Sequence, residues 1–426
     1  MRIAIPAHEA NWAGLMDFLR IMIGGLNELR QTNQLELFLL LPAIRYPGIA
    51  GNFRMAAKRT IKDSLQQQSL RPFRPNQEHH KGFTDFIHQI EGLSCKIIYH
   101  PASDSGLADC LSSIRADVAL PLSAAPRLSL PCPFVGLLVD FQHRRLPSYF
   151  SPQECYQRDI QQAGLLLHAP VAISLSEAVK LDSLHYYPWA DPTTILPLPF
   201  CPQAPSNWLE PLSDNLKQIY QLPDRYFIIS NQFWRHKDHL TAFEALRLLI
   251  REQPLSDAPL GLVCTGSLHD YRSPGHGQAL QNFLNEHQLD ARVRLLGHIP
   301  KRHQIELIKG ALALIQPTLF EGTAGGLCVH DAVAIGVPVL LSDISVNQEA
   351  KADNVSFFKA GDATDLAKAM ASVLDQPPGR PGRQQLLSMA AENRRRMGEF
   401  VLEAINQAIQ RHQQAARCQP VSIPNN

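Results

Sequence analysis

Short apolar runs alternate with longer stretches of helical periodicity along most of this chain, and that alternation restricts the fold more than any other feature. The sequence opens with RIAIP at residues 2–6, a helical stretch at 15–30 and LELFLLLP at 35–42. Strands that alternate with helices are typical of α/β domains. Because the runs are apolar on both faces, we expect them to form a parallel sheet that helices cover on both sides.

The alternation is interrupted once, between residues 195 and 214, where five prolines disfavour a continuous helix or a central strand. At about 150 residues per domain, the 426 residues suffice for two or three domains. We therefore expect a first domain at 1–195, a proline-rich linker at 196–214, a second domain at 215–382, and a carboxyl-terminal helix with a disordered tail at 383–426.

The two expected domains have about the same size and the same construction. Further strands of the first domain are expected at 96–99, 118–122, 134–139 and 171–174. In the second domain we expect strands at 226–230, 260–264, 293–296, 311–316 and 337–342, and helices at 238–251, 276–287, 302–310, 331–336 and 363–374. The sequence thus predicts two α/β cores with a cleft between them.

Composition and charge exclude several classes of protein. With 45% hydrophobic and 19% charged residues the chain can build large cores, and its net charge of +1 gives no long-range attraction to nucleic acid. The eight cysteines form no CxxC pair and no cluster with zinc spacing. The amino terminus lacks the apolar core of a signal peptide, and no run approaches the length of a membrane span. We expect a cytoplasmic protein.

One segment departs from this neutrality, because residues 45–74 contain seven basic residues and a single acid, Asp63. Such a segment would suit an anionic acceptor or the headgroups at the inner face of a membrane, which would make the protein peripheral. A solvated helix and loop is the simpler interpretation, since the segment lacks the interleaved large aromatic residues that favour membrane insertion.

The segment LFEGTAGGLCVHDAVAIGVPVLLSD at 319–343 places two carboxylates around a glycine-rich loop. Glycine lets the backbone approach a ligand closely, and the N–H groups at the start of a helix bind phosphate or sugar oxygens. Glu321 before the loop and Asp331, which we expect to open a short helix, can accept hydrogen bonds from pairs of hydroxyl groups. The set suits a nucleotide-sugar, and a plain glycine-rich turn between strand and helix is the alternative.

A second segment, SNQFWRHKDHL at 230–240, follows the first expected strand of the second domain. Arg235, His236 and Lys237 would lie in its strand-to-helix loop, and ligands of α/β sheets bind at the carboxyl ends of strands. Two cations there can neutralise a diphosphate. Alone, the stretch would equally fit a solvated basic turn.

Six motifs of the second domain occur in an order that resembles the retaining GT-B glycosyltransferases of the large bacterial family glycosyl transferases group 1, whose hallmark is E-x7-E. They are the lysine-containing loop, Thr265-Gly266, LGHIP at 296–300, Gln316-Pro317, Glu321-Gly322, and Asp331-Ala332 before GVPV. In the first domain DFQH at 140–143, with Pro147 and Phe150, and SEAVK at 176–180, before Tyr187-Pro188, are similar to further family segments. The resemblance covers about residues 1–375 and implies two Rossmann-like domains that face each other across a cleft.

The chain departs from the family pattern at two positions. The second acid of the family stands eight positions after the first, whereas position 329 is Val here and Asp331 stands ten positions after Glu321. The family arginine five residues before the loop lysine is Gln232. Arg235 would supply the missing charge, because a guanidinium can bind phosphate through two hydrogen bonds.

The resemblance also implies roles for individual residues. Lys237, with Arg235, would hold the donor diphosphate, Asp331 the ribose, and Glu321 the transferred sugar. His143 would face the reacting centre from the first domain, so that His143 and Glu321 are the catalytic candidates. The full set of expected donor-binding residues is Gly14, Arg235, Lys237, Gly266, His298, Ile299, Glu321, Thr323, Ala324, Gly325, Gly326, Leu327 and Asp331.

We expect no metal and no other cofactor. The sequence holds no Asp-x-Asp and no carboxylate pair suited to magnesium beside a diphosphate. Fixed cations and helix N-termini would then stabilise the departing nucleoside diphosphate. In the family, retention of configuration is commonly described as attack by the acceptor from the same face of the sugar that the phosphate leaves. No enzyme nucleophile is then needed, so we do not expect the two closely placed acids of a retaining glycosidase.

The expected function is transfer of a sugar from a nucleotide-sugar to a glycan, a lipid-linked acceptor or a small molecule, as in polysaccharide biosynthesis. Two alternatives stay open. One is a glycosyltransferase-like protein that has lost catalysis and serves binding or assembly, which the changes at Gln232 and Asp331 would explain. The other is a sugar-nucleotide epimerase of the same architecture. A dehydrogenase is disfavoured, because no GxGxxG follows the opening strand.

Overall fold

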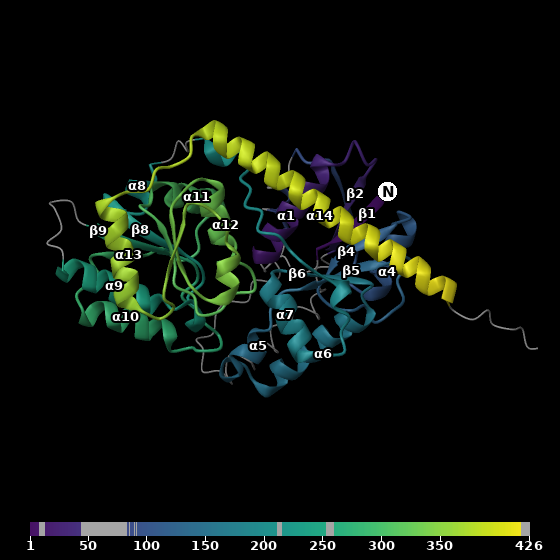
Figure 1. Ribbon diagram of the computed structural model, residues 1–426, viewed down its shortest axis with the longest axis horizontal. Coiled ribbons are helices and arrows are strands. Elements are labelled where there is room, and N and C mark those ends of the chain that lie inside the picture. Colours follow the sequence, from purple (N-terminus) through teal and green to yellow (C-terminus); the bar gives the residue numbers. More distant parts are fainter. Residues whose placement is uncertain are drawn as a thin grey trace, which may run out of the picture.

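The structure is a computed structural model that describes residues 1–7, 13–43, 83–84, 86–88, 90, 92–210, 215–252 and 260–418. The basic segment at 45–74 and the expected disordered tail after Cys418 lie outside the described residues. Two sheets lie side by side along the long axis of the molecule, and one long helix begins beside one of them and runs along the other (Figure 1).

The first domain is built on a seven-stranded parallel sheet with the order β3-β2-β1-β4-β5-β6-β7. Its strands are β1 (Arg2–Pro6), β2 (Glu36–Ala43), β3 (Cys95–Pro101), β4 (Val118–Leu122), β5 (Phe134–Leu138), β6 (Val171–Ser174) and β7 (Ile195–Pro197). Ile3 and Ile5 pack beneath α1 (Ala13–Glu28), whereas Ala4 faces a second core beneath α4 (Asp104–Ser113) and α6 (Pro152–His168). Both faces are thus covered, as the apolar runs predicted.

The second domain is a six-stranded parallel sheet with the order β10-β9-β8-β11-β12-β13. Its strands are β8 (Arg225–Ser230), β9 (Leu260–Thr265), β10 (Val293–Leu295), β11 (Leu314–Gln316), β12 (Val339–Ser342) and β13 (Val355–Phe358). The helices are α8 (Leu216–Ile219), α9 (His239–Glu252), α10 (His276–Glu286), α11 (Lys301–Gly310), α12 (Leu327–Ala334) and α13 (Ala363–Asp375). Helices α9, α10 and α13 cover one face, and α11 and α12 cover the other.

Helix α12 begins four residues before the position expected from the sequence. Gly325 and Gly326 have positive φ angles of 68° and 72°, and Gly326 directly precedes the helix. Once the chain has left this left-handed pair, nothing in LCVHDAVA opposes helix formation. Asp331 therefore lies in the second turn of α12 and does not open it, which corrects the prediction.

The predicted linker begins with an edge strand. Strand β7 pairs only with β6 at the margin of the first sheet, a place where prolines are tolerated. A 3-10 turn, η3 (Ser206–Leu209), follows and buries Trp208. The edge strand β13 of the second sheet was not predicted from the sequence, because its short run VSFF is exposed at its central residues.

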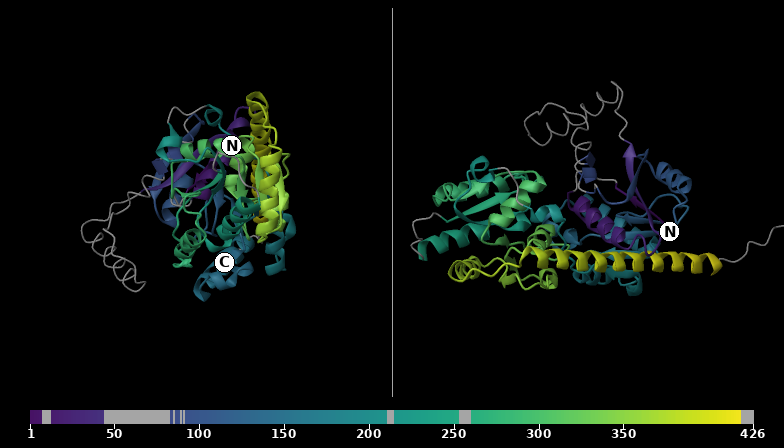
Figure 2. Two further views of the ribbon diagram at one scale, coloured as in Figure 1. Left: turned by 90° about the vertical axis from the view of Figure 1, so that its left-hand side faces the viewer. Right: turned by 90° about the horizontal axis from the view of Figure 1, so that it is seen from above.

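Helix α14 (Arg383–Cys418) extends from the second domain along the whole first domain (Figure 2). Met397, Val401 and Ile405 join the first-domain core. Where α14 crosses α1, the backbones touch at two glycines, because a Cβ on Gly25 would lie 2.7 Å from the backbone nitrogen of Gly398. The carboxyl-terminal helix therefore completes the first core and ties the two domains together.

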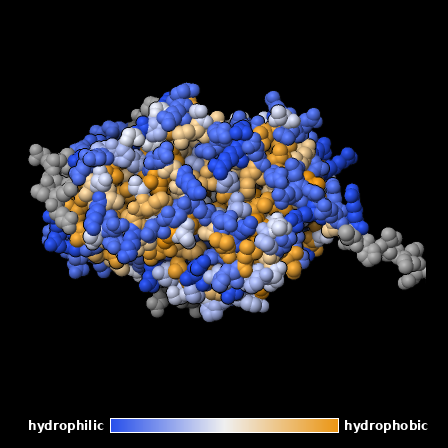
Figure 3. Space-filling model, in the orientation of Figure 1, coloured by the Kyte–Doolittle hydropathy of each residue, from blue (hydrophilic) through white to orange (hydrophobic). Residues whose placement is uncertain are grey.

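Hydrophilic residues cover much of the face drawn in Figure 3, with apolar residues distributed between them. Among the described residues, no helix is both long and apolar enough to span a membrane.

The glycine crossing gives a stability test. Gly25→Ala should lower the free energy of unfolding by about 1–3 kcal/mol, since the new methyl group meets the backbone of α14. Gly24→Ala is the matched control, because its Cβ would meet only Gln203 Oε1 at 3.6 Å, and helix propensity should then raise stability by up to about 1 kcal/mol. Denaturant unfolding measures both, and equal effects would contradict the crossing.

Candidate active site

Two of the predicted donor-binding residues, Lys237 and Glu321, follow β8 and β11, which lie side by side in the centre of the second sheet. The chain leaves β8 through a 3-10 turn, η4 (Arg235–Lys237), and leaves β11 through the loop at 317–326. Because all strands are parallel, both loops lie at the same edge of the sheet. Their side chains meet there.

Lys237 and Glu321 form an ion pair at this edge, with 2.5 Å between Lys237 Nζ and Glu321 Oε1. Their side chains are 14% and 9% exposed. The residues expected to hold the diphosphate and the transferred sugar thus lie within hydrogen-bond distance of each other. A sheltered pair of opposite charges can be exchanged for a ligand that offers both an anion and hydroxyl groups.

Gln316, at the end of β11, fixes the orientation of Glu321. Its buried amide nitrogen donates to Glu321 Oε1 at 2.9 Å and to the carbonyl of Gly325 at 2.8 Å. Asn231, after β8, donates in turn to Gln316 Oε1 at 2.5 Å. The carboxylate is therefore held by a chain of amides that begins on the neighbouring strand.

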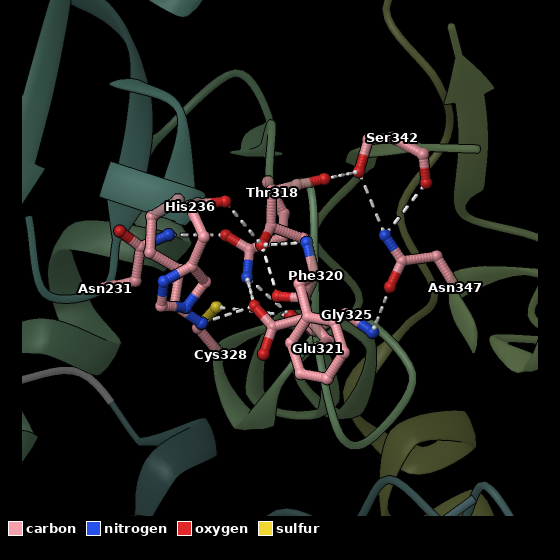
Figure 4. A network of polar contacts seen from close by, with 11 residues as sticks. Asn231, His236, Thr318, Phe320, Glu321, Gly325, Cys328, Ser342 and Asn347 are labelled. Atoms are coloured by element: carbon pink, nitrogen blue, oxygen red, sulfur yellow. Dashed lines mark hydrogen bonds and ion pairs between the residues drawn. The ribbon is translucent and has the colours of Figure 1, made fainter. Parts of the chain in front are cut away.

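The glycine loop is held from the other side by Asn347, which is fully buried. The backbone N–H of Gly325 donates to Asn347 Oδ1 at 2.8 Å, and Asn347 Nδ2 donates to the carbonyl of Ser342 at 2.8 Å (Figure 4). Gly326 directly precedes α12, and no side chain caps the helix. The N–H of Val329 donates to the carbonyl of Gly326 at 3.1 Å, so the N–H groups of Leu327 and Cys328 are the ones that can bind an anion close to Glu321.

Backbone contacts also connect the two loops. The N–H of Leu319 donates to the carbonyl of His236 at 2.8 Å. Ser342 Oγ, at the end of β12, donates to the carbonyl of Thr318 at 2.6 Å and so holds the second loop from the neighbouring strand. Burial, together with the nearby charge of Lys237, keeps the pKa of His236 well below its usual range. His236 is therefore neutral, and the positive charge of η4 comes from Arg235 and Lys237.

The loop that follows Glu321 touches the first domain directly. A Cβ on Gly322 would lie 2.3 Å from the carbonyl oxygen of Val139, so only glycine fits. Ser176 Oγ donates to the Gly322 carbonyl at 2.9 Å. DFQH, which begins directly after Val139, thus lies beside the loop of Glu321.

A second contact between the domains lies at the start of α7 (Glu177–Tyr186). The carboxylate of Glu349, from the second domain, accepts hydrogen bonds from the backbone N–H groups of Glu177 at 3.0 Å and Ala178 at 2.9 Å. A carboxylate at the positive end of a helix is favourable. The motif SEAVK therefore joins the domains through the helix it opens.

His143 is placed differently from the role expected for it. Its side chain has no exposed surface, and its Nε2 lies 2.8 Å from Asp159 Oδ1. The hydroxyl of Tyr187 donates to the carbonyl of the same aspartate at 3.1 Å. Burial lowers the pKa of His143 despite this contact. In this structure His143 belongs to a polar cluster inside the first domain, and its catalytic role stays a prediction.

Asp331, expected to hold the ribose, is 5% exposed and pairs with Lys301, whose Nζ lies 2.6 Å from its Oδ2. Lys301 Nζ also lies 3.0 Å from Asp17 Oδ2 of α1. Burial alone would lower the pKa of Lys301, but the charges of Asp17 and Asp331 outweigh it and raise the pKa. Trp208 covers this cluster, with Lys301 Nζ 5.4 Å from its ring centre.

The remaining donor-binding candidates surround this region with different exposures. Gly266 has a φ of 121°, and a Cβ there would lie 2.0 Å from the carbonyl oxygen of Asn231. His298 is exposed and Ile299 is buried directly after β10. Ala324 is buried, Thr323 is partly buried, Leu327 packs against the first-domain core, and Gly14 lies partly exposed in the first turn of α1.

Arg235 is the candidate that the structure separates from the others. Its side chain is exposed, and its guanidinium lies 5.2 Å from the ring centre of Tyr149 in the first domain. Lys237, two residues later, contacts Glu321 instead. The two cations of η4 thus point to different partners.

Sequence reasoning gave no role to three residues that shape the site. Gln316 was noted only as part of a Gln-Pro motif. An amide side chain at the buried end of a strand is the signal that could have indicated its role in orienting Glu321. Gly322 was noted only as part of the Glu321-Gly322 motif. Asn347 carried no signal, because its function depends on the distant loop at Gly325.

Removal of the Asn347 amide should loosen the glycine loop. Asn347→Ala breaks the contacts with Gly325 and Ser342 and leaves buried polar groups without partners, so we expect a loss of about 3 kcal/mol in the free energy of unfolding. Gln348→Ala, next to it and exposed, should change stability by less than about 0.5 kcal/mol. Equal losses in denaturant unfolding would refute the role of Asn347.

Lys301 should matter more than an exposed lysine. Lys301→Ala leaves the carboxylates of Asp17 and Asp331 facing each other in a buried place, and we expect a loss of about 3 kcal/mol. Lys217→Ala, which removes an exposed pair with Asp224, should cost at most about 1 kcal/mol. Thermal unfolding compares the two, and a harmless Lys301→Ala would show that the cluster is not an ion-pair network.

Comparisons with known structures agree with the fold of this chain. The structure matches HepE from Anabaena in complex with UDP (TM-score 0.54, 12% identity, 98% of this chain and 100% of that chain) and sucrose-phosphate synthase from Thermosynechococcus elongatus (0.57, 15%, 98% and 98%). It also matches WaaG, a glycosyltransferase involved in lipopolysaccharide biosynthesis (0.52, 13%, 98% and 100%). These likenesses confirm the GT-B fold. No curated protein sequence matches the chain.

The match to a protein family lies in the second domain. Residues 214–397 match the family model described as glycosyl transferases group 1. This range holds the Lys237–Glu321 pair, the glycine loop and Asp331. Over residues 214–397, the chain is similar to the glycosyl transferases group 1 family.

Proposed function

We propose that this protein transfers a sugar from a nucleoside-diphosphate donor to an acceptor with retention of configuration and without a metal ion. The observation that carries the proposal is the Lys237–Glu321 pair beside the uncapped start of α12. The pair lies where the second domain meets the first, so a donor held there would face an acceptor on the first domain.

The two partners of the pair would separate when a donor binds. The diphosphate would take the ammonium of Lys237, and the first N–H groups of α12 would add hydrogen bonds and the positive end of the helix dipole. Glu321 would then accept hydrogen bonds from hydroxyl groups of the sugar, while Gln316 keeps the carboxylate in place.

The nucleoside would lie towards Asp331 and the loops after β9 and β10. Asp331 would accept hydrogen bonds from the ribose hydroxyls once Lys301 releases it. Gly266 and the residues His298 and Ile299 would line the base. HepE has been crystallised in complex with UDP and with UDP-glucose, which supports a nucleoside-diphosphate sugar as the class of donor.

Charge stabilisation of the leaving nucleoside diphosphate would be the main catalytic effect. Lys237 and the start of α12 are fixed before the bond breaks, so little reorganisation is needed as negative charge develops. The acceptor hydroxyl would attack from the face that the phosphate leaves. His143 is proposed to approach the reacting centre from the first domain when substrates are bound.

The acceptor would be a glycan, a lipid-linked molecule or a small molecule that the first domain binds. We propose a cytoplasmic site of action, with peripheral contact to the inner membrane face through residues 45–74 if the acceptor is lipid-linked.

A non-catalytic binding protein is the second candidate. Asp331 is paired with Lys301 in this structure, and the exposed Gln232 replaces the family arginine. Both features would fit a protein that has kept the fold and lost the donor.

Thermal unfolding with UDP, GDP, ADP and TDP, followed by hydrolysis of the matching nucleotide-sugars, separates the candidates. A binding nucleotide at about a hundredfold excess over its Kd should raise Tm by roughly 5 °C. Lys237→Ala should lose most of this shift. Glu321→Ala should keep the shift and lower donor turnover roughly 10- to 100-fold. Lys368→Ala, an exposed lysine on α13, is the control.

Two results would count against the proposal. If none of the nucleotides shifts Tm, the non-catalytic candidate is favoured. If Lys237→Ala and Glu321→Ala turn over the best donor as fast as the wild type, the site assignment is wrong. Turnover in EDTA equal to turnover in magnesium is the result expected of a metal-independent enzyme.

A further inference from the structure

A second positively charged site lies between the domains, and it is separate from the Lys237–Glu321 pair. Arg235 and Arg272, from the second domain, line a hollow of about 40 Å³ together with Ser148 and Tyr149, from the first domain. A buried water needs about 10–15 Å³ by this measure, so the hollow has room for about three waters or one phosphate group.

The two guanidinium groups are held by aromatic rings rather than by acids. Arg235 lies 5.2 Å from the ring centre of Tyr149, and Arg272 lies 4.1 Å from that of Phe150 and 5.0 Å from that of Trp234. Arg272 Nη1 also donates to Gln142 Oε1 at 2.9 Å. Stacking fixes a guanidinium without neutralising it.

Asp270 is the acid that lines the hollow, and it forms no ion pair with the guanidinium group of Arg235 or of Arg272. Asp270 is buried and accepts hydrogen bonds from the backbone N–H of Arg235 at 3.1 Å and of Arg272 at 2.9 Å. His236, which also lines the hollow, is neutral because burial and nearby cations depress its pKa. Among the residues that line the hollow, two positive charges face one carboxylate, which leaves a net attraction for an anion.

The position of the hollow indicates which substrate would supply that anion. Its first-domain wall, η1 (Pro147–Tyr149), follows directly after DFQH and α5 (Gln142–Arg145), on the domain expected to bind the acceptor. Lys237 points away from it towards Glu321. The donor diphosphate thus has its own cation, and the two arginines remain for another group.

We propose that Arg235 and Arg272 bind a phosphate or carboxylate group of the acceptor, so that the acceptor class is an anionic sugar or sugar phosphate. This inference rests on the proposed function and assigns Arg235 to the acceptor instead of the donor. The fork of a guanidinium can hold two oxygens of such a group and thereby orient the hydroxyl that receives the sugar.

Thermal unfolding with inorganic phosphate, glucose 6-phosphate and glucose as probes tests the proposal on the full chain. Both phosphates should raise Tm of the wild type and of Lys237→Ala, and glucose should not. The double variant Arg235→Gln/Arg272→Gln should bind glucose 6-phosphate about tenfold or more weakly. Arg251→Gln, an exposed arginine on α9, is the matched control, and Arg272→Lys should keep part of the affinity because it keeps the charge.

The Tm shift caused by a nucleoside diphosphate distinguishes this inference from the proposed function. The double variant should keep the wild-type Tm shift with the best nucleoside diphosphate. Loss of that shift would assign the arginines to the donor and overturn the inference. Failure of both phosphates to shift the wild type would also overturn it. No shift with any nucleotide would contradict the proposed donor site alone, because the phosphate probes report on the hollow by themselves.

Discussion

The approach of Gly322 to the carbonyl of Val139 determines how the two domains meet. A side chain at position 322 would lie 2.3 Å from that oxygen, so the loop after Glu321 can touch the first domain only because it carries glycine. Ser176 then binds the carbonyl of Gly322, and Glu349 binds the start of α7. The carboxylate proposed to hold the sugar is thus placed at the domain boundary by backbone contacts that do not involve it.

Two ion pairs occupy the places where we propose that the donor binds. Lys237 pairs with Glu321, and Lys301 pairs with Asp331. Charges that would be costly to bury alone are compensated in this way, and each pair can be exchanged for a ligand that offers an anion or hydroxyl groups. The cluster at Lys301 also reaches Asp17 of the first domain, so binding at Asp331 would be coupled to the arrangement of the domains.

Most of the architecture could be predicted because parallel strands buried on both faces leave a clear apolar signature. The strands at 118–122 and 171–174 have the predicted bounds, and the meeting of Lys237 with Glu321 follows from the parallel order of β8 and β11. The local sequence pattern gave wrong or missing predictions where contacts between distant segments determine the structure. It placed the start of α12 at Asp331, and it could not find Asn347, whose amide acts on a loop 22 residues away. The orientation of the Arg235 side chain depends on its contact with the ring of Tyr149 in the first domain, and a contact between domains cannot be predicted from the local sequence.

A crystal structure of the protein with the nucleoside diphosphate that binds it tests the central claim most directly. The account predicts that the diphosphate contacts Lys237 Nζ and the first N–H groups of α12, and that the bond between Lys237 and Glu321 is broken. A nucleotide bound elsewhere, with the Lys237–Glu321 pair intact, would contradict it.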